Sequence, residues 1–296
     1  MPTWGEVLKE IQGFQVTQSI DAVRRKYLAA LAELTGRPVI AYYSSWLSGS
    51  QVANHAISDA DMNAFMSAVH KLPRDQGLDL ILHTPGGDLA ATEAIVAYLR
   101  TMFGTDIRAI IPQIAMSAGT MIACACKSVV MGKQSSLGPI NPQINGLPAA
   151  GVIAEFEKAV QEITIDPART ELWQVIIGKY HPTFLGECEK GIQWADSMVT
   201  DWLFTGMFKG KRGARKKAER TAENLDRHGT DSNHSRHLSI DDCIAAGLIV
   251  EKMEDNHDLQ DLILTVHHSF IHTFALTPTI KIVENSNGAA MVLHKT

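Results

Sequence analysis

The chain has 296 residues, of which 45% are hydrophobic and 20% are charged, so it can bury a sizeable core in one large domain or two small ones. Its net charge of -5 argues against general binding to nucleic acid, although it allows a local basic patch. The four cysteines form no Cys-x-x-Cys pair, which favours buried free thiols over disulfides or a metal site and suits a reducing cytoplasm. No basic and apolar leader is visible, so we expect no secretory signal and a cytoplasmic location.

The first 36 residues are predicted to be helical. Between Ile20 and Leu34 the apolar residues recur at the spacing of one helix face, and Gly36 follows as a helix end. We divide the chain into an N-terminal helical arm, residues 1–36, and a main domain, residues 37–296. Packing on that domain is the simpler role for the arm, and contact with another subunit is the alternative.

The first of two strand–turn–helix units lies in the middle of the chain. Residues 78–82 are a short apolar run typical of a buried strand, and apolar residues at helical spacing begin at Leu89. Between them, Gly86 and Gly87 allow positive φ angles and can bring bare N–H groups close to a ligand. His83 directly precedes this turn, and we expect it to form a hydrogen bond that fixes the turn.

The second unit follows about thirty residues later. Residues 107–112 predict a strand, the next turn contains Ser117, and residues 120–125 predict a helix of small residues. The uncharged stretch 109–126 is about as long as a membrane span requires. Its proline, glutamine, serine and glycine residues favour a buried strand–turn–helix, so we expect no membrane span.

The other predicted elements also alternate between strands and helices. In chain order they are a strand at 38–43, a helix from 58 to about 72, a strand within 127–133, a fixed loop at 135–142, helices over 150–205, a basic segment at 209–220, a polar loop at 228–237, a helix at 239–247, a strand at 248–250, a helix at 259–276 and a strand at 279–283. This order predicts an α/β fold with a largely parallel sheet. Ligands of such sheets bind at the carboxyl ends of the strands, where both glycine turns fall.

Ser117 is the candidate nucleophile of the chain. A serine nucleophile needs a base to take its proton and hydrogen-bond donors to stabilise the oxyanion. The backbone N–H groups of Gly87 and Ala118 are the natural donors, helped by the positive end of the following helix, while Gly86 supplies the turn. The alternative is that the small residues only permit tight packing and a particular backbone geometry.

Three motifs carry a resemblance to a known family: HTPGGD at 83–88, AMSAGT at 115–120 and SSLGPINPQ at 135–143. They resemble the ClpP/crotonase superfamily, its signal peptide peptidase A-like serine proteases, and among these the serine dehydrogenase proteinase family. RRKYLAALAELTGRPVIAYYSSWL, HSRHLSIDD and TPTIKIVEN extend the resemblance over nearly the whole chain. It implies a ClpP/crotonase-like fold with a parallel core sheet flanked by helices. The helices predicted over 150–205 and the basic segment after them are then additional helical segments, in a helical, partly basic insertion at about 150–235.

The resemblance also implies a general base. ClpP proteases place a histidine in the loop that SSLGPINPQ resembles, but Asn141 stands at that position and cannot accept the proton. Signal peptide peptidase A-like enzymes use a later lysine, about forty residues after the serine in archaeal members, and Lys158 lies 41 positions after Ser117. Apolar neighbours would lower the pKa of Lys158, whereas an exposed lysine paired with Glu155 or Glu162 is the simpler alternative. The reserve candidates are Lys179, Lys190 and His181.

The family pattern further implies an aspartate at position 141, so Asn141 is a departure that either weakens activity or is neutral in a structural turn. We expect a serine endopeptidase with a Ser117–Lys158 dyad that acts on peptide or protein substrates as a homo-oligomer without a cofactor. A non-catalytic scaffold and a crotonase-type acyl-CoA enzyme are the alternatives.

Two further sequence features remain outside this scheme. The basic segment 209–220 is interpreted as a solvated helix face, and contact with an acidic partner or with nucleic acid is the alternative. The segment has no interleaved aromatic residue, which argues against binding to nucleic acid. His268 and His272 have a spacing compatible with a metal, but no acidic or cysteine ligand is near in sequence, so we expect no metal.

Overall fold

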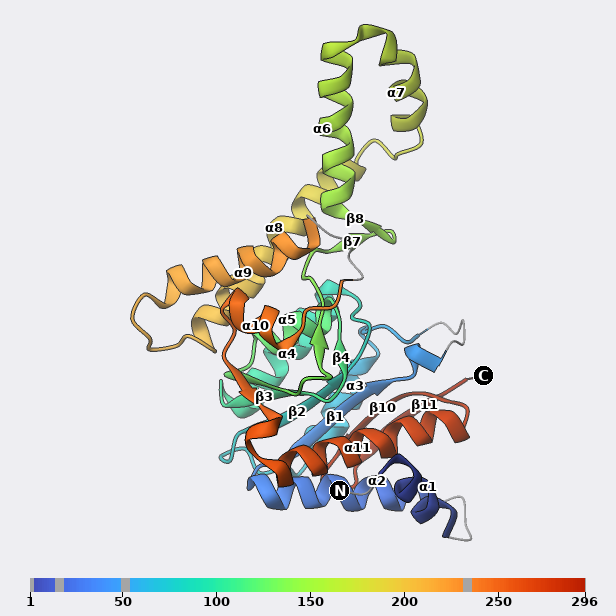
Figure 1. The fold of residues 1–296 in the computed structure, drawn as a ribbon, viewed down its shortest axis with the longest axis vertical. Coiled ribbons are helices and arrows are strands. Elements are labelled where there is room, and N and C mark those ends of the chain that lie inside the picture. The colour runs from blue at the N-terminus through green and yellow to red at the C-terminus, as the bar shows by residue number, and fades with distance from the viewer. Residues whose placement is uncertain (1–2, 14–18, 49–53, 231–235, 296) are drawn as a thin grey trace.

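The computed structural model describes residues 3–13, 19–48, 54–230 and 236–295 (Figure 1). The strands of its main sheet are β1 (Val39–Ser44), β2 (Leu78–His83), β3 (Ile107–Ile111), β5 (Ser128–Met131), β9 (Val250–Lys252), β10 (Thr279–Asn285) and β11 (Ala290–His294). They are ordered β11-β10-β1-β2-β3-β5-β9. The five from β1 to β9 are parallel, β10 pairs antiparallel with β1, and the edge strand β11 pairs antiparallel with β10. The largely parallel sheet confirms the α/β prediction, although the last strand, β11, is an addition to it.

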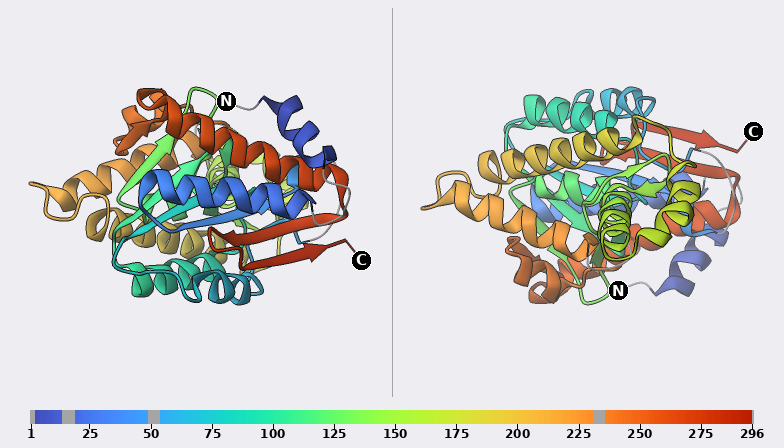
Figure 2. Two further views of the ribbon diagram at one scale, coloured as in Figure 1. Left: turned by 90° about the horizontal axis from the view of Figure 1, so that it is seen from below. Right: turned by 90° about the horizontal axis from the view of Figure 1, so that it is seen from above.

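Helices cover both faces of this sheet (Figure 2). The helices are α1 (Trp4–Gly13), α2 (Ser19–Thr35), α3 (Asp61–Val69), α4 (Leu89–Phe103), α5 (Ala118–Cys124), α6 (Ala149–Ile165), α7 (Thr170–Ile177), α8 (Phe184–Thr205), α9 (Ala214–Thr230), α10 (Ile240–Ala246) and α11 (His257–Leu276). On one face, α1, α2 and α11 bury a cluster that includes Leu28 and Phe270. On the other face, α3, α4 and α5 share a larger cluster with α8, α9 and α10.

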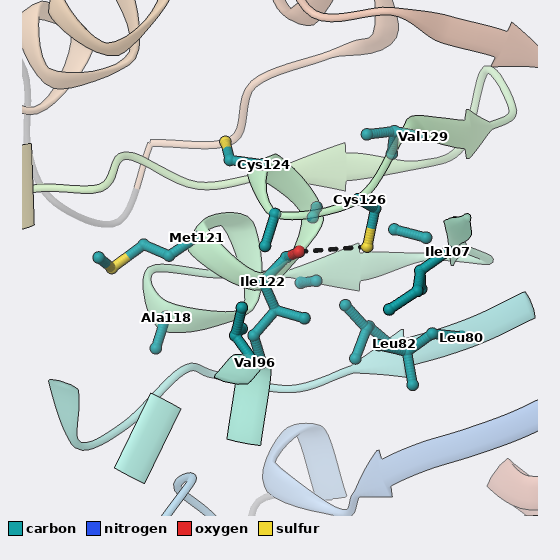
Figure 3. Packing of buried hydrophobic residues seen from close by; sticks show 14 of the residues in the cluster. Leu80, Leu82, Val96, Ile107, Ala118, Met121, Ile122, Cys124, Cys126 and Val129 are labelled. Carbon is teal, nitrogen blue, oxygen red and sulfur yellow. Dashed lines mark hydrogen bonds between the residues drawn. The ribbon is translucent and has the colours of Figure 1, made fainter. Parts of the chain in front are cut away.

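The small-residue helix α5 lies in the middle of that larger cluster (Figure 3). Its side chains pack against Leu80 of β2 and Ile107 of β3, so the helix that follows Ser117 is locked to the sheet. Cys124 and Cys126 belong to this core, and all four cysteines are buried and unpaired, as predicted. Burial raises the pKa of the Cys126 thiol to about 12, so this thiol is inert near neutral pH.

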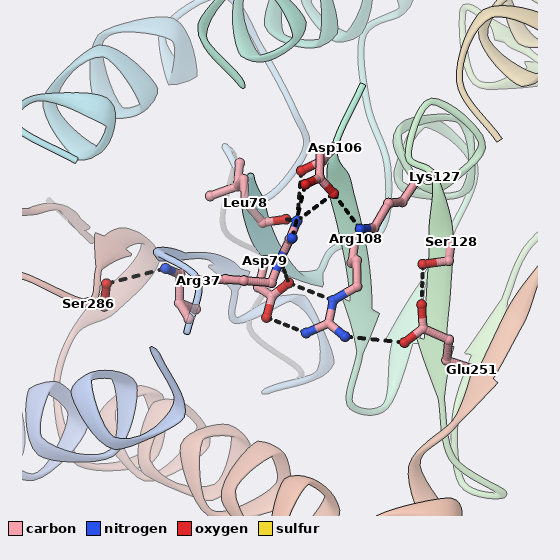
Figure 4. A network of polar contacts seen from close by, with 10 residues as sticks. Arg37, Leu78, Asp79, Asp106, Arg108, Lys127, Ser128, Glu251 and Ser286 are labelled. Atoms are coloured by element: carbon pink, nitrogen blue, oxygen red, sulfur yellow. Dashed lines mark hydrogen bonds and ion pairs between the residues drawn. The ribbon is translucent and has the colours of Figure 1, made fainter. Parts of the chain in front are cut away.

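Charged side chains join the amino ends of the parallel strands (Figure 4). The buried Asp79 carboxylate, near the start of β2, accepts from Arg37 Nε at 2.9 Å and from Arg108 at 2.8 and 2.7 Å. Arg108 also donates to Glu251 of β9 at 3.2 Å. This network fixes one end of the sheet and leaves the opposite, carboxyl end to the glycine turns.

Two short pairs of strands, β4 (Ile114–Ala115) with β6 (Ser136–Leu137) and β7 (Gln143–Ile144) with β8 (Leu147–Pro148), lie beyond that carboxyl end. From there α6 and α7 stand out from the core, and α8 returns to it (Figure 1). We refer to α6 and α7 as the helical arm, which is distinct from the N-terminal arm of residues 1–36. The helical prediction for residues 150–205 is thereby confirmed.

None of the helices in the described ranges is both long enough and apolar enough to cross a membrane. The uncharged stretch 109–126 forms β3, β4 and α5, which is the predicted strand–turn–helix.

Candidate active site

The two turns at the carboxyl ends of β2 and β3 lie directly against each other. A parallel bridge joins Thr84 to Ala115, in which the Met116 N–H donates to the Thr84 oxygen at 2.9 Å. Gly119 lies so close to this bridge that a Cβ on it would be 2.6 Å from Thr84 Cγ2. The two strand–turn–helix units are therefore packed directly against each other at their turns.

The Gly86–Gly87 turn is fixed by a neighbouring segment around Ile57. The Ile57 N–H donates to the Gly86 oxygen at 2.8 Å, and the Asp88 N–H donates to the Ile57 oxygen at 2.9 Å. A Cβ on Gly87 would strike the Ile57 backbone, and a Cβ on Gly86, at φ 96°, would lie 2.8 Å from Ser117 Cβ. These two hydrogen bonds use the Gly86 carbonyl and the Asp88 amide, which both face the Ile57 segment. The Gly87 amide between them therefore points away from that segment.

Ser117 has an unusual backbone conformation, with φ 51° and ψ -116°. Non-glycine residues seldom adopt it, and the strain costs about 1–3 kcal/mol. The surrounding turn holds it in place, since the Gly119 N–H donates to the Met116 oxygen at 2.8 Å and the Met121 N–H to the Ser117 oxygen at 3.0 Å. A sharp strand-to-helix turn of this kind presents a serine hydroxyl as a nucleophile.

Ser117 lies on a cavity of about 690 Å³ that both turns line. Gly86, Gly87 and Ala118 line the same cavity, and the far wall comes from the β7–β8 hairpin and from Trp194 on α8. Among the residues that the structure describes, the Gly87 and Ala118 amides have no acceptor and the Ser117 hydroxyl has no partner. By contrast, the Gly86 amide donates to Thr84 Oγ1 at 3.2 Å, which fits a turn role.

A buried ion pair between Lys281, which lies in the TPTIKIVEN motif, and Asp61 supports the wall of this cavity. The motif did not indicate a role for either residue. Lys281 Nζ donates to both Asp61 oxygens at 2.9 Å and to the Ala56 oxygen at 2.8 Å. Asp61 also accepts from the Ser58 N–H at 2.9 Å and from the Tyr42 hydroxyl at 3.0 Å. The pair therefore anchors the segment that bridges the glycine turn. A lysine inside the apolar run TIKIV was the available sequence signal.

Thr120 holds the loop 135–142 against the site. Its hydroxyl donates to the Gly138 oxygen at 2.9 Å and accepts from the Gly138 N–H at 3.0 Å. Ile140 and Pro142 of this loop line the cavity. Asn141 between them is 1% exposed, and neither of its amide atoms has a partner among the described residues.

His83 is completely buried and does not line the cavity. Its Nδ1 lies 3.2 Å from the Ser44 oxygen and its Nε2 lies 3.2 Å from Gln113 Oε1. The ring stacks on Tyr43 at 5.3 Å and lies 5.4 Å from the ring of His267. Burial, partly offset by the Gln113 and Ser44 hydrogen bonds, lowers the pKa of His83, so the ring packs beneath the site as a neutral group.

Because several histidines are buried, we expect the protein to lose stability in acid. Burial, followed by the charges of His83 and His268, lowers the pKa of His267 well below 6.5, whereas the unfolded chain binds protons near pH 6.5. The free energy of unfolding should therefore fall as the pH drops below about 6.5, by up to about 1.4 kcal/mol per pH unit for each such histidine. Urea unfolding at pH 8 and pH 5 measures the fall, which should be smaller for His267→Gln. Equal falls in both proteins would contradict this account.

Lys158 is not among the residues that line the cavity. It lies on α6 of the helical arm, its side chain is 65% exposed, and its nitrogen is 3.9 Å from Glu162 Oε1. The apolar neighbours Val152 and Phe156 pack towards α8, so they leave Lys158 on the opposite, solvated face. The reserve candidates Lys179, Lys190 and His181 are likewise exposed and do not line the cavity. A single chain therefore brings together Ser117, Gly86, Gly87 and Ala118 but not these bases.

The histidines of the other two sequence patterns, His268 with His272 and His237, do not line the cavity. His268 and His272 lie against the indole ring of Trp4, and His272 Nε2 is 3.1 Å from the Trp4 oxygen. In the HSRH motif, His237 is exposed and is followed by Leu238, which pairs with Leu137; His234 lies outside the described residues. Within the described ranges no three histidine, cysteine or acidic side chains are grouped as a metal site.

Comparison with known proteins gives two kinds of match. The model of a family described as ClpP-like SDH-type serine proteinase matches residues 51–172. Two uncharacterized proteins of Methanocaldococcus jannaschii are also similar: MJ0137 is 36% identical over 112 residues and MJ1495 is 34% identical over 108 residues. These alignments cover 38% and 36% of this chain and 37% of each relative, so the chain spans little more than a third of the curated relatives it matches.

Proposed function

We propose that this chain is a serine peptidase in which Ser117 attacks a peptide carbonyl, because residues 51–172 match the model of the ClpP-like SDH-type serine proteinase family. The observation that carries the proposal is the strained Ser117 in a cavity beside the unpaired amides of Gly87 and Ala118. These two N–H groups stabilise the oxyanion of the tetrahedral intermediate. The intermediate then expels the amine half of the substrate, which takes the proton that the base removed from Ser117, and leaves an acyl-enzyme. Water hydrolyses this acyl-enzyme and releases the second product.

The proposed base is Lys158, supplied by a second copy of the chain. The helical arm stands out from the core (Figure 1). Lys158 on α6 does not line its own cavity, and the arm exposes large apolar side chains to solvent. These are Val160, Ile165, Leu172 and Val175, at 67%, 84%, 58% and 65% exposure. Burying them in a homo-oligomer is favourable, and a lysine buried there in a neighbouring cavity has a lowered pKa, as a base requires.

Labelling with a fluorophosphonate probe, read by intact mass, tests the nucleophile. We expect one adduct on the wild type and on the control Ser67→Ala, which removes an exposed serine of α3, and none on Ser117→Ala. A wild type that folds normally but carries no adduct would refute the peptidase and support the non-catalytic scaffold.

A mixture of two variants tests the base. Lys158→Ala alone should label much more slowly than the wild type. If a second copy supplies the base, mixing Lys158→Ala with Ser117→Ala should restore labelling of the Lys158→Ala chains, up to the fraction of mixed pairs. Normal labelling of Lys158→Ala alone would keep Ser117 as the nucleophile and exclude Lys158.

A further inference from the structure

A second cavity, of about 420 Å³, lies between α9, the carboxyl end of α10 and the turn that follows α8. It shares no lining residue with the cavity that holds Ser117. Part of its wall comes from the basic segment 209–220, which has no role in the proposed peptidase. Its volume lies in the range of sites that enclose small molecules.

Three cations line this second cavity: Lys211, Lys217 and Arg220. None of them has an ion-pair partner within 4.0 Å in the described part of the chain. Arg215 on the same helix is different, because it pairs with Asp201 at 2.6 Å and with Glu219 at 3.1 Å. Two local acidic groups, Asp201 and Glu219, are thus paired outside the cavity, and the three cations that line it are exposed and have no ion-pair partner among the described residues.

Uncharged groups complete the wall and fit an anion. Thr221 is 3% exposed, and a Cβ on Gly247, which has a φ of 110°, would lie only 2.6 Å from its hydroxyl oxygen. Asn224 Nδ2 donates to the Ala246 oxygen at 3.2 Å, so one carbonyl at the end of α10 that would repel an anion is already capped. Phe208 and Ile249 supply an apolar surface on the same cavity.

We propose that this cavity binds the phosphate group of a small molecule of about nucleotide size. Arg220 can hold two phosphate oxygens at once through its planar guanidinium, and the two lysines add point charges. The remainder of the ligand lies against Phe208 and Ile249. The site includes neither Ser117 nor Lys158, so its test does not depend on the proposed peptidase activity.

Isothermal titration calorimetry of the full chain with ATP and with tripolyphosphate tests the site. Arg220→Gln and Lys217→Gln should each raise the Kd for both probes at least about tenfold, because each removes a charge-assisted contact. Lys216→Gln makes the same change of charge on an exposed residue that does not line the cavity, and it should change the Kd less than about twofold. Circular dichroism checks that all three variants are folded.

The two probes separate the phosphate from the rest of the ligand. ATP that binds more tightly than tripolyphosphate would assign the apolar wall to the base and sugar, and equal affinities would place recognition in the phosphates; either result supports the site. Binding that Lys216→Gln weakens as much as Arg220→Gln does would show a diffuse basic surface and overturn it. Absence of binding to folded wild type would also overturn it.

Discussion

Replacing Lys281 by methionine is expected to lower the free energy of unfolding by about 3–5 kcal/mol, because it leaves the buried Asp61 carboxylate without its partner. The two side chains are only 5% and 6% exposed, so water cannot take the place of the ammonium group. Methionine keeps most of the apolar stem, which confines the change to the charge and its hydrogen bonds. Urea unfolding followed by circular dichroism measures the loss.

Two further variants separate the ion pair from a general effect of the substitution. Lys252→Met on β9 removes an exposed lysine and should change stability by less than about 0.5 kcal/mol. Lys281→Met combined with Asp61→Leu should be more stable than Lys281→Met alone, since no unpaired charge stays buried. A single variant as stable as the wild type would contradict the role given to the pair.

Replacing Gly87 by alanine is expected to reduce kcat for a p-nitrophenyl ester by about 10²–10³, the effect of losing one oxyanion donor. The added Cβ would strike the Ile57 backbone, so the turn must rotate or the segment must move, and either change redirects the Gly87 amide. The expected loss is larger in kcat than in KM, because the donor acts on charge that develops in the transition state. Steady-state kinetics on protein shown to be folded by circular dichroism measure it.

Gly146→Ala is the matched control for this variant. Gly146 lines the same cavity and also has a positive φ, but a Cβ there would meet no atom within 4 Å. It should keep kcat within a few-fold of the wild type. Comparable losses in both variants would attribute the effect to a general disturbance of the cavity, and full activity of Gly87→Ala would exclude its amide as a donor.

The parts of the fold that depend on neighbours in sequence could be predicted. The strand at 78–82, the turn at Gly86 and Gly87 and the helix from Leu89 are found where they were predicted, and so is the turn before α5. In each case the strand, turn and helix are encoded in one continuous segment, residues 78–103 and 107–124. Proximity of the two glycine turns follows from the parallel order of their strands, because the carboxyl ends of adjacent strands meet at one edge.

Contacts between distant segments could not be predicted in this way. Lys281 and Asp61 are 220 positions apart, and nothing in either local pattern indicates the other. The environment of Lys158 shows a second limit. Its apolar neighbours correctly predict a helix with a buried face, but periodicity does not determine whether a lysine near that face is covered. In this chain α8 covers Val152 and leaves Lys158 in solvent.

The helical arm joins the rest of the molecule beside the cavity that holds Ser117. Helix α6 has 17 residues and is therefore about 25 Å long. It starts directly after β8, in the hairpin whose other strand, β7, contributes Ile144 to the cavity wall. A tilt of about 10° at this base displaces the far end by about 4 Å. Because Ile144 of this hairpin lines the cavity, such a tilt would also displace part of the cavity wall near Ser117.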